Sequence, residues 1–165
     1  MRIVADSSPL IALTKLGCLD RVRAVYTRIW ITRAVYGEIV VAGQGMPGAR
    51  EIAQSEWIEI VDLRNPGSLR TLELKYNLGA GEISTFVLAQ EISADIMLVD
   101  DLRARRIAAG FNVAVSGTIR LLEILYERGQ VADLRLLFQQ LLETGSRMDP
   151  ALLNRRLAMY GLPPR

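Results

Sequence analysis

The chain has 165 residues, half of them hydrophobic, and a formal net charge of +2, which fits one globular domain and excludes a disordered segment. It has no histidine, which excludes histidine general bases, Ser-His-Asp and Cys-His nucleophile systems, and histidine-bound zinc. Its one cysteine, Cys18, excludes an internal disulfide and a multi-cysteine metal site.

Short apolar runs alternate along the chain with segments in which apolar residues recur at helical spacing. The runs predict buried strands, in chain order at 2–5, 29–31, 57–61, 95–99 and 113–115. The helical spacing and the capping residues predict helices, in chain order at 9–16, 32–40, 47–53, 68–76, 82–92, 102–109, 117–126, 134–142 and 150–160. The expected caps include Ser8 before Pro9, Thr32, and Asp149 before Pro150.

This alternation predicts an α/β fold with three layers, αβα, in which a five-stranded parallel sheet lies between helices. Two amphipathic helices follow the last strand and its helix. We therefore expect a core domain over residues 1–129 and a C-terminal helical extension over residues 130–165, packed on the same domain.

No apolar run approaches the roughly 18 residues that a membrane span needs. Asp6 stands where a signal peptide has its apolar stretch. We therefore expect a cytoplasmic protein without membrane contact.

Acidic residues stand where the predicted strands end. Asp6 directly follows the first strand, and Asp100 and Asp101 follow the fourth. Glu82 begins a helix at the same edge, and Glu38 lies in the helix after the second strand. Ligands of an open parallel sheet bind outside the carboxyl ends of its strands, so we expect these side chains to converge there.

Each of these acids also has an ordinary structural interpretation. The three aspartates are suitable helix caps, Glu82 complements a helix dipole, and Glu38 fits a solvated helix position. Convergence favours a different interpretation, because like charges held together raise the free energy unless a cation offsets them. Carboxylates without histidine fit Mg²⁺ or Mn²⁺, which can activate a water and stabilise the leaving oxygen of a phosphodiester.

Four segments carry a resemblance to a known family. The segments around the acids read Val4-Ala5-Asp6-Ser7-Ser8-Pro9, Ile31 to Ile39, Gly79 to Ser84, and Leu98-Val99-Asp100-Asp101. In their order and spacing they resemble PIN domains, and most closely a prokaryotic branch related to the toxin ribonucleases of toxin–antitoxin pairs. The resemblance implies a metal-dependent ribonuclease that acts on single-stranded or structured RNA.

The resemblance also implies roles for individual residues. Asp6, Glu38, Glu82 and Asp100 would be catalytic and bind the metal, with Asp101 as an alternative or additional ligand. Ser7 would support the metal or a phosphate through its hydroxyl. Many members are silenced by a small antitoxin protein, and members often form homodimers, so both are expected partners beside RNA.

Three arginines follow the acidic pair on one predicted helix. Arg103, Arg105 and Arg106 are expected to contact RNA phosphates, and the alternative is a solvated helix face. Two other functions remain open. One is a nucleic-acid-binding module that keeps the fold with little or no catalysis. The other is a phosphate-accepting switch, suggested by the Asp100-Asp101 pair.

Overall fold

The computed structural model describes residues 1–108, 110, 113–146 and 148–165 of the chain. It contains a five-stranded, all-parallel sheet with the strand order β3-β2-β1-β4-β5. The strands are β1 (Ile3–Ala5), β2 (Ile29–Thr32), β3 (Ile58–Val61), β4 (Ile96–Leu98) and β5 (Ala114–Ser116). The predicted α/β class and the predicted parallel sheet are both confirmed.

Helices connect the strands and follow the last one. They are α1 (Ser7–Lys15), α2 (Leu19–Arg23), α3 (Arg33–Tyr36), the π-helical turn η1 (Gly37–Val41), α4 (Ala49–Gln54), the 3₁₀ turn η2 (Pro66–Ser68), α5 (Leu69–Tyr76), α6 (Ala80–Glu91), α7 (Leu102–Ala108), α8 (Thr118–Glu127), α9 (Leu134–Glu143) and α10 (Pro150–Met159). In the part of the chain that the structure describes, none of them is long and apolar enough to cross a membrane.

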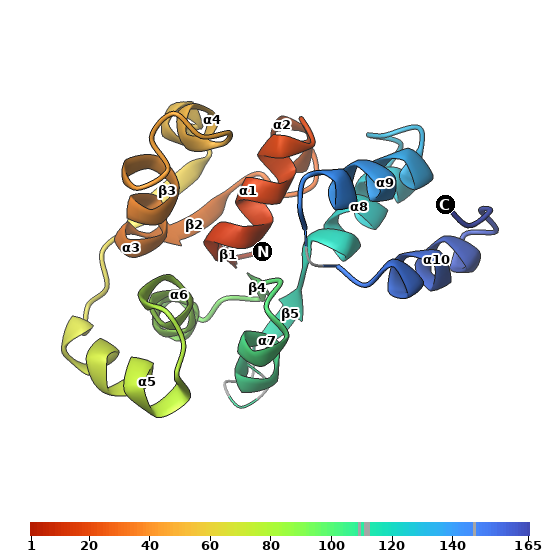
Figure 1. Ribbon diagram of the computed structural model, residues 1–165. Coiled ribbons are helices and arrows are strands. Elements are labelled where there is room, and N and C mark those ends of the chain that lie inside the picture. The colour runs from red at the N-terminus through yellow and green to blue at the C-terminus, as the bar shows by residue number, and fades with distance from the viewer. Residues whose placement is uncertain (109, 111–112, 147) are drawn as a thin grey trace.

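Alternate residues of each strand point into different helical layers, as the pleat of a strand requires. Ile3 and Ala5 of β1 belong to one hydrophobic cluster, and Val4 between them belongs to the other. The first cluster is covered by α1, α2, α8, α9 and α10, and the second by α5, α6 and α7. The sheet therefore lies between two helical layers, α1 and α2 on one side and α6 and α7 on the other (Figure 1).

The C-terminal helices belong to the first of these clusters. Phe138 of α9 and Leu153 and Leu157 of α10 are fully buried in it, together with residues of β1 and α1. In Figure 1, α8, α9 and α10 lie together at one end of the molecule, where α9 packs on α8 and α10 packs on α9. The first helical layer thus continues without a break into these helices.

Some element boundaries differ from the prediction. The first helix begins at Ser7 with Asp6 in the N-cap position, so Ser8 is not its cap. The amide of Asp6 donates to the carbonyl oxygen of Leu98 at 3.0 Å, so Asp6 stays paired with β4 and the helix begins directly after it. The fourth helix begins only after Gly48, because that residue has a left-handed φ of 103° that a helix cannot contain.

Two further differences concern the helices after β1 and β2. The short helix α2 was not predicted, since it has five residues and no side-chain cap. The helix predicted over 32–40 is two pieces, α3 and the wider turn η1. Thr32 and Asp149 cap their helices as predicted. The helix predicted over 102–109 is present through Ala108, and Ala109 lies outside the described residues.

Candidate active site

The centre of the sheet contains a topological switch point. The chain passes from β1 outward to β2 and β3, and then returns to place β4 on the other side of β1. Ala5 of β1 is in register with Leu98 of β4, so the residues after both strands emerge side by side. Open α/β sheets bind their ligands at this place, outside the carboxyl ends of the strands.

Asp6 is the most deeply buried acid at this edge, with only 2% of its surface exposed. Its Oδ1 atom has no hydrogen-bond partner within the described residues, and its side chain makes no capping hydrogen bond to α1. Burial raises the pKa of Asp6 to about 7. The nearby N–H groups of Ser7 and Ser8 lower it in part, and the negative charges of Glu82 and Glu38 raise it further. The start of α1 therefore accounts for this carboxylate only in part, since Oδ1 remains without a partner.

Glu38 reaches the site from the π-helical turn η1. The amide of Ala42 bonds the carbonyl of Gly37 at 2.8 Å, the wider i→i+5 hydrogen bond that is common near functional sites. The Oε1 atom of Glu38 accepts a hydrogen bond of 3.1 Å from the amide of Gly81 at the start of α6. This contact requires glycine, since a Cβ on Gly81 would lie 2.4 Å from that oxygen.

Substituting Gly81 by alanine is therefore expected to displace Glu38 from α6. We expect Gly81→Ala to weaken any activity of the site and to lower the free energy of unfolding by no more than about 1 kcal/mol, because the displaced carboxylate is the end of a flexible side chain and alanine favours the helix. Gly79→Ala is the matched control, because a Cβ there would meet only Glu82 Oε2, at an ordinary 3.5 Å. Urea denaturation of both variants measures the difference, and equal effects would contradict the contact.

Glu82 lies in the first turn of α6 and accepts a hydrogen bond of 2.9 Å from the amide of Gly79. Burial raises its pKa, the Gly79 amide lowers it, and the charges of Asp101 and Glu38 raise it again. The positive charge of Arg103 acts in the opposite direction. Asp6, Glu38, Glu82 and Asp101 are thus electrostatic neighbours, although they come from four separate parts of the chain.

Asp100 and Asp101 have different surroundings. Asp100 binds the N-terminus of α8, accepting from the Thr118 amide at 2.7 Å and the Thr118 hydroxyl at 2.5 Å. Burial raises its pKa, while Thr118 and the charge of Arg105 lower it. Asp101 caps α7 by accepting from the amides of Arg103 and Ala104, both at 2.8 Å. Of these two aspartates, Asp101 is the one whose charge acts on Glu82, and Asp100 lies between α8 and Arg105.

Sequence reasoning missed Thr118 as a partner of the acidic pair. The available signal was a threonine at the start of the helix after β5, the strand beside β4 in the sheet. Gly117, just before it, has the same constraint as Gly81, because a Cβ there would lie 2.7 Å from Asp100 Oδ1.

The remaining predicted residues lie around this group. Ser7 is half-buried in the first turn of α1, directly after Asp6. The three arginines of α7 are exposed. Arg103 acts on Glu82 and Arg105 acts on Asp100, whereas Arg106 has no hydrogen bond or ion pair among the described residues. The three arginines thus have different acidic neighbours, and their contact with RNA stays a prediction.

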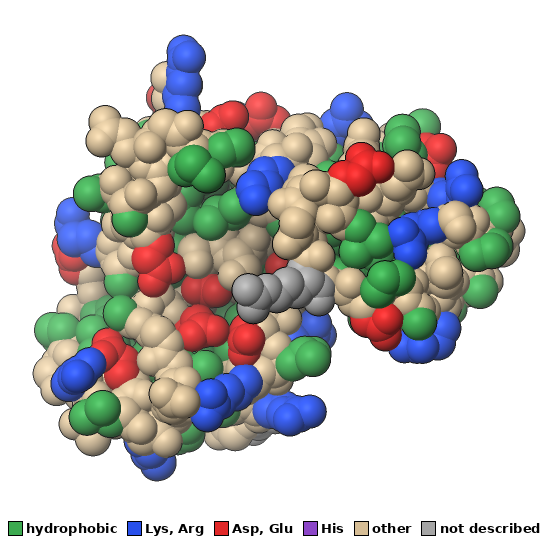
Figure 2. All heavy atoms as spheres, viewed as in Figure 1, with side chains coloured by type: hydrophobic (Ala, Val, Ile, Leu, Met, Phe, Trp, Pro, Cys, Tyr) green, Lys and Arg blue, Asp and Glu red, His purple; other side chains and the backbone are tan. Residues whose placement is uncertain are grey.

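The acidic side chains gather on one face of the molecule. Figure 2 shows several of them between α3, α6 and α7, with basic side chains over α7 beside them. Over residues 1–108, 110, 113–146 and 148–165, no three acidic side chains are placed so that they could hold a metal in common. Glu38, Glu82 and Asp101 are each hydrogen bonded to backbone amides, and among the described acidic side chains only Asp6 has a buried oxygen without a partner.

This donor set still fits one hard divalent cation. All the donors are carboxylate oxygens, and Mg²⁺ usually binds through only one or two protein carboxylates and keeps several waters. A cation would also offset the repulsion that raises the pKa values of Asp6 and Glu82.

Fold and site together define a doubly wound α/β domain with acidic side chains at its switch point. A family model described as a PIN domain matches residues 2–161, a span that includes α9 and α10. The chain therefore belongs to the PIN domain family. PIN domains are generally nucleases, and they usually use divalent ions such as Mg²⁺ or Mn²⁺. A comparison with curated proteins found no match.

Proposed function

We propose that this protein is a divalent-metal-dependent endoribonuclease whose metal site is centred on Asp6. The observation that carries the proposal is the buried Oδ1 atom of Asp6, which lacks a hydrogen-bond partner among the described residues and lies beside Glu82 and Glu38. A buried carboxylate oxygen without a partner raises the free energy of the folded state, and a neutral or apolar side chain at this position would avoid that cost. Retaining a carboxylate here is explained if it binds a cation.

Asp6 would bind the ion directly, and Glu82 and Glu38 would act on it through its bound waters, with Asp101 next to Glu82. The bound ion would lower the pKa of a water molecule and offset negative charge on a phosphodiester. Because Asp6 is buried away from bulk water, its negative charge is weakly screened and acts strongly on groups close to it. Arg103, which is close enough to lower the pKa of Glu82, would hold a substrate phosphate beside the acids.

The test is cleavage of a labelled single-stranded RNA with and without Mg²⁺ or Mn²⁺. We expect cleavage only with metal, and a loss of roughly 100-fold or more in Asp6→Asn, since even partners of metal ligands are worth about 10- to 100-fold. Asp20→Asn is the control, because Asp20 is an exposed aspartate on α2, outside the site. Equal cleavage by wild type and Asp6→Asn would identify a contaminating nuclease.

A second candidate function is an RNA-binding module with little or no catalysis. The observation that favours it is that Glu38, Glu82 and Asp101 are engaged with backbone amides and form no ready group of three ligands. This candidate predicts RNA binding that survives Asp6→Asn, and no cleavage at any concentration of either metal.

We further propose that the nuclease serves as the toxin of a toxin–antitoxin pair and acts as a homodimer. The support is the resemblance of its four acidic segments to toxin ribonucleases. Growth arrest on expression, relieved by a small protein encoded beside it and absent in Asp6→Asn, is the expected result. Growth arrest that persists in Asp6→Asn would contradict a catalytic toxin.

A further inference from the structure

A groove runs from the acidic side chains toward the C-terminal helices. It consists of two hollows of about 500 and 450 Å³ that share Asp100, Leu102 and Met148 as lining residues. The first hollow lies between α1 and the segment before α10, and it begins at Ser8, two residues from Asp6. The second lies between α7, β5 and α10. Asp101, whose charge acts on Glu82, also lines the first hollow, so the groove borders the proposed active site.

The carboxylates that border the groove are already bound. Asp100 accepts from the first amide of α8, Asp101 from two amides of α7, and Asp149 from Ala151 in α10. The N-terminus of a helix carries a partial positive charge, which offsets a carboxylate held there. These three acids therefore repel a polyanion less than free carboxylates would.

The cations that line the groove are available to a ligand in different degrees. The side chain of Arg105, in the second hollow, makes no hydrogen bond or salt bridge within the described residues, although its charge acts on Asp100. Lys15, in the first hollow, makes one hydrogen bond, at 3.3 Å to the carbonyl of Thr144. Among the described residues, each hollow thus presents one exposed cation that is not held in a salt bridge and can bind a phosphate oxygen.

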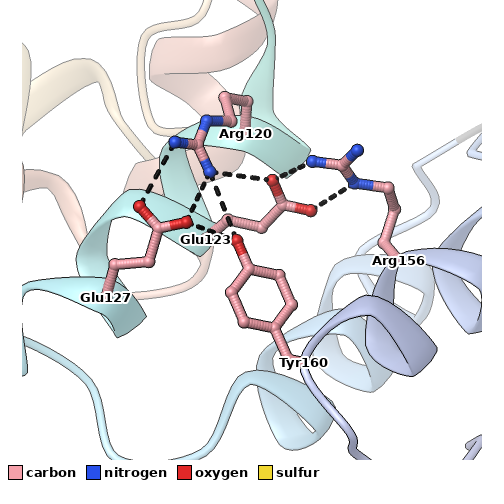
Figure 3. A network of polar contacts seen from close by, with 5 residues as sticks. All are labelled: Arg120, Glu123, Glu127, Arg156 and Tyr160. Atoms are coloured by element: carbon pink, nitrogen blue, oxygen red, sulfur yellow. Dashed lines mark hydrogen bonds and ion pairs between the residues drawn. The ribbon is translucent and has the colours of Figure 1, made fainter.

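Two further arginines line the second hollow as fixed groups. Figure 3 shows Arg120 and Arg156 joined through Glu123, with Arg120 also bound to Glu127 and Tyr160. Arg156 binds Glu123 through two hydrogen bonds, which fixes the plane of its guanidinium group. Planar guanidinium groups stack on nucleobases.

We propose that this groove binds single-stranded RNA, with phosphates at Lys15 and Arg105 and bases against Leu102, Met148 and Leu152. The inference rests on the proposed nuclease function and names the path of its substrate. Unpaired bases bind through flat stacking surfaces and apolar contacts as well as charge, and the guanidinium groups of Arg120 and Arg156, the apolar wall and the two cations supply these. The path gives the C-terminal helix α10 a role in substrate binding.

The first test is fluorescence anisotropy with a labelled single-stranded RNA octamer in EDTA, so that no cleavage intervenes. We expect Arg105→Gln to weaken binding about 5- to 10-fold and to reduce the salt slope by about 1. Arg50→Gln, which removes the same charge from an exposed position on α4, should remain within 2-fold. An equal loss in Arg106→Gln would overturn the groove, since Arg106 lines neither hollow.

The second test addresses the apolar wall. Leu102 and Met159 are both 70% exposed, so neither Leu102→Glu nor Met159→Glu should affect folding, which thermal unfolding will verify. Leu102 borders both hollows, and Met159 borders neither. We expect Leu102→Glu to weaken RNA binding at least 5-fold and Met159→Glu to leave it within 2-fold. Equal effects, or a duplex that binds as tightly as the single strand, would contradict the proposal.

These outcomes separate the groove from the nuclease function. If metal-dependent cleavage disappears in Asp6→Asn but Arg105→Gln and Leu102→Glu bind RNA like wild type, the groove is wrong and the nuclease stands. If both variants lose RNA binding but no metal supports cleavage, the nuclease proposal fails while the groove remains an RNA-binding surface.

Discussion

Replacing Asp6 by asparagine is expected to stabilise the metal-free protein at pH 8 by about 1–3 kcal/mol. Burial raises the pKa of this carboxyl from 3.8 to about 7, so its ionised form is unfavourable in the folded state. A rise of that size corresponds to on the order of 4 kcal/mol of unfolding free energy. A buried asparagine amide keeps part of that cost, which leaves the smaller net gain.

The pH dependence follows from the sign of this pKa change. Asp6 binds its proton more tightly when folded than when unfolded, so its stabilising effect is fully present below about pH 4 and is lost as the pH rises through 7. This loss of stability does not occur in Asp6→Asn, because asparagine does not titrate. The advantage of the variant should therefore be largest at pH 8 and shrink steadily toward pH 4.

Urea denaturation in EDTA at pH 5 and pH 8 measures both effects. Asp20→Asn is the control and should stay within about 0.5 kcal/mol of wild type at either pH, since Asp20 is exposed. A lower midpoint for Asp6→Asn at pH 8 would mean that the carboxylate stabilises the fold, and the case for a cation at this position would then disappear.

The destabilising carboxylate of Asp6 also predicts how the protein responds to a metal ion. A ligand that binds only the folded state stabilises that state by mass action. A cation bound at Asp6 would therefore offset the destabilising effect of the buried carboxylate. Mg²⁺ or Mn²⁺ should therefore raise the unfolding midpoint of wild type and have little effect on Asp6→Asn. The stability cost and the metal response then have a single origin, the buried oxygen of Asp6.

The sequence predicted the sheet and the edge where the acids meet, because both follow from local pattern. Apolar runs such as Ile96–Leu98 are buried strands, and the residue after such a strand emerges at its carboxyl end. Local pattern could not predict that Asp101 caps α7 whereas Asp100 binds the start of α8. It depends on the packing of β5 against β4, which brings Thr118 to Asp100.

Two other features depend on contacts between distant segments. The sequence of the π-helical turn that carries Glu38 also fits an ordinary helix. The contact between Glu38 and Gly81 joins segments far apart in the chain, so local pattern could not predict it. The groove is likewise formed by α1, α7 and α10, which are far apart in the chain. The pattern around Arg105 predicted a cation on a helix face, but not the hollow that it borders.

Replacing Arg156 by methionine is expected to give the largest loss of stability among the variants proposed for this protein. The Glu123 carboxylate is completely buried and receives two hydrogen bonds from Arg156, which links α8 to α10 (Figure 3). In Arg156→Met it keeps only Arg120, at 3.3 Å. Removing one partner of a buried ion pair costs about 3–5 kcal/mol, and because Arg120 remains we expect a loss near the lower end of that range.

A double-mutant cycle separates the ion pair from simple packing. In Glu123→Met/Arg156→Met both charges are absent and apolar volume replaces them, so we expect most of the lost stability to return. Arg155→Met is the control, because its partner Asp149 lies 3.8 Å away and both side chains are largely exposed. Urea denaturation measures the cycle, and limited proteolysis of α10 reports whether that helix detaches. If Arg156→Met and Arg155→Met lose equal stability, the pair does not hold α10 in place, and the wall of the groove that contains Arg156 is not fixed by Glu123.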